Sequence, residues 1–244
     1  MSRVYFIHDF DNCLVMQLEH TLKTIVDVYT RTALAHGSPF DYAETERILV
    51  DNFIKTGLGH TVFAQYGIDV DVLYHEVHET LFAEIDGQHD AEAYAIYEDL
   101  LSHPSHVHCV LTHGTTDWAL NNLRATGLGH LFHEDQVIGL DKMGADHPKS
   151  KSPRGFQLAL DSIGLSEADI PHTEIYFTDD SAINHPIPHE MGLRTVHVGP
   201  KVPEYMDAKY IRYRAETLAC FLKTFQPHLD LERKTKPSRA QRLG

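Results

Sequence analysis

The chain has 244 residues, of which 42% are hydrophobic, and a formal net charge of -14. This length fits one large domain or a core domain with a smaller insertion, and the apolar content is sufficient for a packed core. The excess of acidic residues argues against nonspecific binding to nucleic acid or anionic membranes. The apolar runs are too short to cross a bilayer. The N-terminus has no signal-peptide pattern, so we expect a cytoplasmic protein.

The first predicted strand, Val4–His8, leads directly into two carboxylates, Asp9 and Asp11. Side chains of a strand alternate between its faces, so this spacing predicts both groups on one side, at the carboxyl end of the strand. Carboxylates this close repel each other unless they share a cation or a proton. They are therefore candidates for a metal site, or for a nucleophile and an acid/base. The alternative is an ordinary Asp-rich turn after a strand.

A long helical stretch separates this strand from the second one, His106–Leu111. The gap is too long for a single crossover, and we expect a small helical domain, residues 15–100, inserted after the first strand. An insertion at the carboxyl edge of a parallel sheet lies over the ligand site. Apolar residues recur at helical spacing through four predicted helices, which are Leu18–His36, Tyr42–Thr56, Val70–Glu84 and Ala91–Ser102.

The second strand ends in Thr112, His113 and Gly114, and a helix is predicted to follow between Thr116 and Gly127. A hydroxyl, a glycine turn and a helix start offer hydrogen-bond donors to an oxyanion such as phosphate. The alternative is that the threonine only caps the helix.

Two lysines, Lys149 and Lys151, come before a helix predicted to begin at Ser152–Pro153 and to end at Ile163. Two more apolar strands follow, Glu174–Thr178 and Arg194–Val198, and the first of them ends in another carboxylate pair. Apolar strands that alternate with helices predict an α/β fold, a doubly wound parallel sheet covered on both faces. The core would comprise residues 1–14 and 101–225, and the basic residues 226–244 would form a solvated tail.

These segments together resemble the haloacid dehalogenase superfamily. The run from Asp9 to Leu14 resembles the Asp-x-Asp-x-(Thr/Val/Cys)-Leu motif of its phosphatases, and the run from Asp179 to Asn184 resembles the Asp-Asp-Ser-x-x-Asn form of a later motif. The residues in these two motifs are most similar to those of the pyrimidine 5'-nucleotidase branch. Thr112 matches the phosphate-binding hydroxyl of the second motif.

The lysine motif departs from the family pattern, which is commonly Lys-Pro-x-Pro-x-x-Phe. Here Ser150 stands at the expected lysine position, with Lys149 and Lys151 on either side, although Pro153 and Phe156 match. Either lysine side chain is long enough to compensate. Lys151 is preferred because it lies next to the helix start, and Lys149 is kept as a near equal.

The resemblance implies a Rossmann-like core with an inserted helical cap. It also implies a Mg²⁺-dependent phosphatase that hydrolyses a small phosphomonoester, such as a nucleoside 5'-monophosphate, through an aspartyl-phosphate intermediate. Asp9 would be the nucleophile and Asp11 the acid/base. The implied metal ligands are Asp9, Asp180 and the backbone carbonyl of Asp11. The implied phosphate-binding residues are Thr112, His113, Gly114, Lys149 and Lys151. Asp179 and Asn184 would support the metal ligands and the lysine.

Three alternatives stay open from the sequence: a phosphomutase, a C–halogen hydrolase on the same scaffold, and a non-catalytic phosphate-binding module. A C–halogen hydrolase needs neither the second carboxylate nor the metal, so Asp11 and Asp180 disfavour it. The expected partner is a small phosphorylated metabolite, with no nucleic acid and no membrane, and a homodimer is compatible with the sequence.

Overall fold

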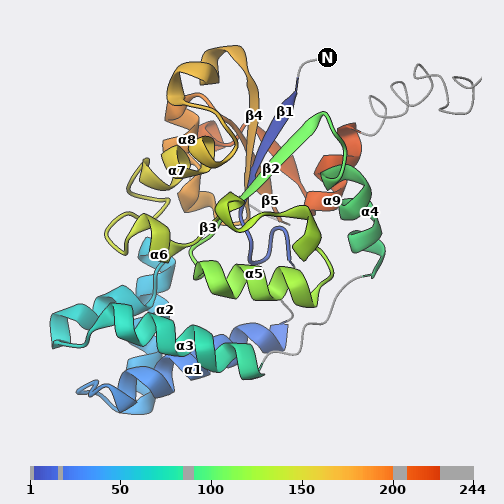
Figure 1. Cartoon of the computed structure of the whole chain (residues 1–244). Helices are drawn as coiled ribbons and strands as arrows, with labels where there is room; N and C mark the ends of the chain where they lie inside the picture. The colour runs from blue at the N-terminus through green and yellow to red at the C-terminus, as the bar shows by residue number, and fades with distance from the viewer. Residues whose placement is uncertain (1–2, 16–18, 85–90, 200–207, 226–244) are drawn as a thin grey trace, which may run out of the picture.

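A single parallel sheet forms the centre of the protein (Figure 1). The computed structural model describes residues 3–15, 19–84, 91–199 and 208–225. Within them, six strands pair in the order β3-β2-β1-β4-β5-β6, and every pair is parallel. The strands are β1 (Val4–His8), β2 (His106–Leu111), β3 (Val137–Ile138), β4 (Glu174–Asp179), β5 (Arg194–Val198) and β6 (Tyr213–Ala215).

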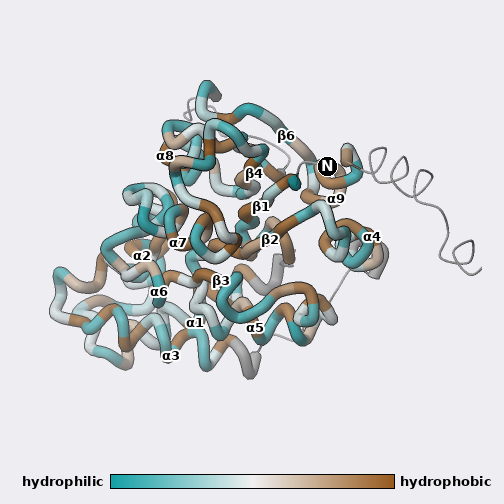
Figure 2. The backbone as a smooth tube through the Cα atoms, turned by 45° about the horizontal axis from the view of Figure 1, so that its top comes forward, coloured by the Kyte–Doolittle hydropathy of each residue, from teal (hydrophilic) through white to brown (hydrophobic). Residues whose placement is uncertain are grey.

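Helices cover both faces of this sheet. Phe6 and Ile7 are neighbours on β1, both are fully buried, and they belong to separate apolar clusters on opposite faces. Burial on both faces explains why the central strands are apolar almost throughout (Figure 2), and the predicted doubly wound α/β fold is confirmed. The helices of the core are α4 (Ala91–Leu101), α5 (Thr116–Ala125), α6 (Leu140–Met143), α7 (Arg154–Ser162), α8 (Pro186–Met191) and α9 (Leu218–Leu222).

A group of helices inserted between β1 and β2 lies on the side of α5 away from the sheet (Figure 1). Leu49, Leu73 and Val77 are buried among them. The Asp41 side chain accepts a hydrogen bond from Glu44 N–H and caps the second of these helices. We call this group the cap helices: α1 (Glu19–Ala35), α2 (Tyr42–Thr56), the short 3₁₀ helix His60–Tyr66 and α3 (Val70–Glu84).

The fourth predicted helix of the insertion has a different place. It corresponds to α4, which packs beside α9 and β2 rather than with the cap helices. The His106 side chain bonds the carbonyl of Leu100 at 3.1 Å, which ties the end of α4 to β2. The predicted insertion, residues 15–100, therefore includes nearly all of α4, a helix that packs with the core.

Two strands were not predicted, β3 and β6, because they have only two and three residues and β6 is largely exposed. The predicted tail, residues 226–244, lies outside the described residues. None of the helices in the described part of the chain combines the length and the apolar character that a membrane span requires.

Candidate functional site

The turn after β1 places the first two carboxylates. Asp9 N–H donates to the Thr178 carbonyl at 2.8 Å and so extends the β1–β4 pairing by one residue. The chain then bends through Asn12, which has a positive φ of 57° that Asn tolerates better than most residues. Because β1 ends at His8, the two carboxylates are placed by this turn and not, as predicted, by the alternation of a strand.

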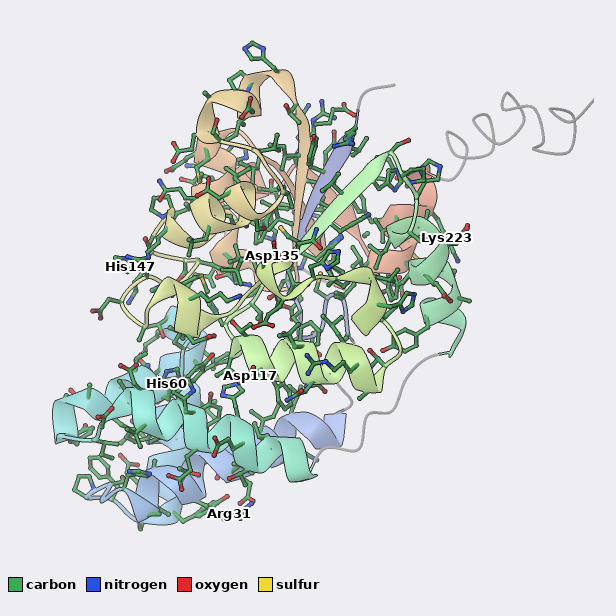
Figure 3. All side chains as sticks on the ribbon, viewed as in Figure 1. Arg31, His60, Asp117, Asp135, His147 and Lys223 are labelled. Carbon is green, nitrogen blue, oxygen red and sulfur yellow. The ribbon has the colours of Figure 1, made fainter. Side chains whose placement is uncertain are left out.

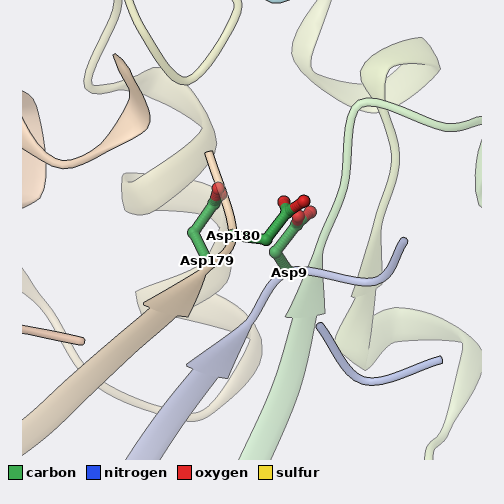
Figure 4. A group of neighbouring side chains, drawn as sticks. All are labelled: Asp9, Asp179 and Asp180. Carbon is green, nitrogen blue, oxygen red and sulfur yellow. The ribbon is translucent and has the colours of Figure 1, made fainter. Parts of the chain in front are cut away.

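Three carboxylates meet at the carboxyl edge of the sheet. Asp9 follows β1, Asp179 ends β4, and Asp180 comes next (Figure 4). One oxygen from each lies within 4.8 Å of the others. The parallel order of β1 and β4 brings these distant segments together because their carboxyl ends share one edge.

A buried lysine joins two of these carboxylates. Lys149 Nζ lies 2.6 Å from Asp9 Oδ1 and 2.7 Å from Asp179 Oδ2, and it also donates to the Leu111 carbonyl at 3.2 Å. Burial alone would lower the pKa of this ammonium group, but the Asp179 and Asp9 carboxylates raise it above its ordinary value. Lys149 is therefore held as a cation in the site.

The structure favours Lys149 over Lys151, against the preference drawn from the sequence. Lys149 is 1% exposed, whereas Lys151 is exposed to solvent. The backbone N–H of Lys151 donates to the Pro148 carbonyl in a turn before α7. This turn directs the two side chains differently, and motif spacing alone could not predict it.

Asp179 is engaged by protein groups, as expected for a supporting residue. Its carboxylate accepts hydrogen bonds from the Asn184 side chain at 3.1 and 3.0 Å and from Ser181 N–H at 2.7 Å, in addition to Lys149. Asp9 and Asp180 are thus the members of the cluster better placed to share a further cation.

The protonation of these two carboxyl groups supports the same assignment. Burial, followed by the charge of Asp179, raises the pKa of Asp9 well above its usual range and that of Asp180 to about 7. A divalent cation would remove this repulsion, and a set of oxygen ligands suits Mg²⁺. The donor set of the cluster therefore fits the metal that the sequence predicts.

The loop after β2 contains the predicted phosphate-binding residues. Thr112 is buried, and its hydroxyl accepts a hydrogen bond from Gly114 N–H at 2.9 Å. The His113 ring accepts one from Lys149 N–H through Nε2 at 2.9 Å. The His113 ring therefore holds the backbone of the lysine segment. This role differs from the predicted one, in which His113 binds phosphate directly.

The start of α5 is capped by protein side chains. Trp118 N–H donates to Thr115 Oγ1 at 3.0 Å, and Thr116 N–H donates to Asp141 Oδ1 at 2.7 Å. These two helix N–H groups are already bonded, so the prediction of a phosphate at the helix start rests mainly on Thr112 and Lys149.

Two residues of the site were missed from the sequence, Trp118 and Tyr74. The Trp118 indole N–H lies 3.2 and 3.3 Å from the two oxygens of Asp11. The Tyr74 hydroxyl, on α3, donates to the His113 carbonyl at 2.5 Å and links the cap helices to the core. One signal was available: Trp118 is the only tryptophan in the sequence, and it follows the Gly-Thr-Thr turn.

A cavity of about 280 Å³ lies where α3 meets α5. Figure 3 shows Asp117 on the side of α5 that faces the cap helices, whereas Arg31 lies at the far side of these helices. Trp118 lines this cavity and also bonds Asp11, so one residue connects the cavity with the predicted acid/base. Its lining residues are His75, His78, Glu79, Thr115, Asp117, Trp118, Asn121 and Asp141.

Comparison with known proteins places the fold. No protein-family model and no curated protein matches the sequence. Among solved structures, CbbY from Rhodobacter sphaeroides in complex with phosphate has a TM-score of 0.61 at 17% identity, over 88% of this chain and 94% of that one. The haloacid dehalogenase-like hydrolase SP0104 from Streptococcus pneumoniae has a TM-score of 0.60 at 19% identity, over 92% and 99%.

A third similar structure is the β-phosphoglucomutase of Clostridium difficile, with a TM-score of 0.57 at 12% identity over 97% of this chain and 100% of that one. At these identities the likeness concerns the fold and not the reaction. The chain therefore has the fold of haloacid dehalogenase-like proteins.

Proposed function

We propose that the protein is a Mg²⁺-dependent phosphatase of the haloacid dehalogenase superfamily that hydrolyses a small phosphomonoester. The observation that carries this proposal is the meeting of Asp9, Asp179 and Asp180 around the buried Lys149 at one edge of the sheet. A nucleophilic carboxylate, a fixed cation and a metal-type cluster of acids are together suited to phosphoryl transfer through a covalent intermediate.

In this proposal Asp9 attacks phosphorus and forms an aspartyl-phosphate, while the bond from phosphorus to the ester oxygen breaks. Asp11 gives its proton to that leaving oxygen and then accepts one from the water that hydrolyses the intermediate. Lys149 and the Thr112 hydroxyl would bind the phosphoryl oxygens. Mg²⁺ held by Asp9, Asp180 and the Asp11 carbonyl would supply charge stabilisation when bound.

The cap helices complete the proposed site. Tyr74 fastens α3 to the loop that contains Thr112, and Ser150 Oγ donates to the Thr56 carbonyl at 3.1 Å at the end of α2. Cap helices in this position would exclude water from the reaction and contact the leaving group. Nucleoside 5'-monophosphates are one substrate class to test, and the sequence resemblance is the only support for them.

The experiment is a phosphatase screen over nucleoside monophosphates, sugar phosphates and p-nitrophenyl phosphate, with wild type beside Asp9→Asn. We expect phosphate release that EDTA abolishes, that Mg²⁺ restores and that the variant lacks. Full activity after metal removal, or in the variant, would contradict the proposal.

Two additions to this screen separate the alternatives: a 2-haloacid with halide detection, and analysis of the sugar phosphates for isomerisation. A phosphomutase would isomerise a sugar phosphate without releasing phosphate, and a C–halogen hydrolase would release halide from a 2-haloacid without Mg²⁺. A phosphate-binding module would bind phosphate and turn over none of these substrates.

A further inference from the structure

Trp118 holds the partly buried carboxylate of Asp11 by a hydrogen bond. Its indole N–H lies 3.2 Å from one carboxylate oxygen and 3.3 Å from the other, and the tryptophan is 3% exposed. The two residues are 107 positions apart, so the bond connects the turn after β1 to α5. A hydrogen bond to a charged group is stronger where the group is partly shielded from water than where it is fully exposed.

The indole ring is itself fixed by its surroundings. The backbone N–H of Trp118 donates to Oγ1 of the helix cap Thr115 at 3.0 Å. A Cβ atom added to Gly114 would lie 2.6 Å from Trp118 Cδ1, so the ring packs where a side chain at Gly114 would stand. On the cap side, His78 of α3 meets the ring edge to face, with centroids 5.6 Å apart. The position of the N–H group is thus set by both core and cap.

The chemistry of indole limits what this contact can do. The N–H group donates only and has no lone pair that could accept the Asp11 proton. It cannot take part in the proton transfer, but it can fix the carboxyl group in one orientation. An acid that protonates a leaving group depends on such orientation, since small misplacements reduce the rate strongly.

We infer that Trp118 is a positioning residue that orients Asp11 for protonation of the leaving oxygen. This inference rests on the proposed phosphatase function and adds a residue to its machinery. It implies a specific kinetic pattern, because only substrates whose leaving group needs a proton depend on a well-oriented acid.

The test compares two substrates in Trp118→Phe, which keeps an aromatic ring and removes the donor. With β-glycerophosphate, whose alkoxide leaves poorly, we expect kcat/KM to fall by about tenfold. With p-nitrophenyl phosphate, whose phenolate leaves without a proton, kcat/KM should stay within about twofold. The value of kcat/KM depends only on the steps up to and including ester cleavage, so hydrolysis of the aspartyl-phosphate does not affect it.

Two further variants separate positioning from packing. Replacement of Trp118 by 3-benzothienylalanine keeps the ring size and removes only the N–H group, so it should reproduce the selective loss even if Trp118→Phe folds poorly. In the Asp11→Asn background, Trp118→Phe should cause no further loss with β-glycerophosphate, because the two residues act through one step.

An equal loss with both substrates, no loss with either, or an additive loss in the double variant would overturn the inference and leave the proposed function standing. A wild-type protein inactive on every phosphomonoester would overturn the proposed function and the inference with it.

Discussion

Lys149 Nζ and Asp9 Oδ1 lie 2.6 Å apart, on side chains that are 1% and 9% exposed. Asp179 accepts from the same ammonium group at 2.7 Å, so one cation stands between two buried carboxylates. Attraction in such a place must offset the loss of hydration of all three charges. Removal of the central charge therefore has a larger effect than removal of either neighbour.

The first prediction concerns Lys149→Met. It leaves two buried carboxylates without their shared cation, and breaking a buried pair in this way costs about 3–5 kcal/mol of unfolding free energy. Activity should also be lost, because a charge for the phosphoryl oxygens is gone. Urea denaturation followed by circular dichroism, together with phosphate release, measures both effects.

Lys151→Met is the matched control for that variant. The residue is exposed, so we expect a change in unfolding free energy within about 0.5 kcal/mol and nearly full activity. If Lys151→Met proves the more damaging of the two, the assignment of the functional lysine must be reversed.

The second prediction is that Asp9→Asn loses turnover by at least about 10⁴-fold without unfolding. Its effect on stability should be small, because the change removes a partner of Lys149 and also one of three mutually repelling carboxylates. Asp179 stays beside the lysine. Circular dichroism melts of the metal-free proteins measure stability, and a variant that is unfolded would show that Asp9 is mainly structural.

The third prediction follows from the pKa of Asp180, which burial and then the charge of Asp179 raise from 3.8 to about 7. The folded protein therefore holds a proton that the unfolded chain releases between these two values. Stability from this group is fully present below about pH 4 and is lost as the pH rises through about 7. Metal-free Asp180→Asn should lack this loss.

The comparison must be the difference between wild type and Asp180→Asn, since buried histidines act in the opposite sense. Burial lowers the pKa of His8 to about 3, so its contribution is lost as the pH falls below its ordinary 6.5. Mg²⁺ needs deprotonated ligands and should raise the wild-type Tm more above pH 7 than below it. An equal Mg²⁺ effect in Asp180→Asn would exclude Asp180 as a ligand.

The fourth prediction concerns the link between cap helices and core. Tyr74→Phe removes the donor to the His113 carbonyl and should lower the unfolding free energy by about 1 kcal/mol. The loop that holds Thr112 should become less well fixed, so KM should rise more than kcat falls. Tyr66→Phe, at a residue 38% exposed, is the control and should behave as wild type in both measurements.

The sequence was sufficient for the elements that carry a strong local signal. Strands β1, β2 and β5 and helices α2 and α3 match their predicted bounds, because the buried strands contain short apolar runs and the helices have clear periodicity. The short strands β3 and β6 have no such pattern and owe their form to their neighbours in the sheet.

The chemistry of the site was predictable to the extent that it follows strand ends. Asp9 and Asp180 could be expected to meet, since parallel strands end at one edge. The side-chain directions of Lys149 and Lys151 depend on a turn, and the bond from Trp118 to Asp11 depends on how α5 packs. Contacts of that range leave no periodic trace in the sequence.

Because Trp118 is the only tryptophan of the chain and stands between α3 and the Asp11 carboxylate, its fluorescence comes from this site alone. The wild-type protein thus contains an intrinsic optical reporter, and no label has to be introduced. Changes in Trp118 emission during titration with vanadate, or during rapid mixing with substrate, would report changes at the contact between the cap helices and the core in real time.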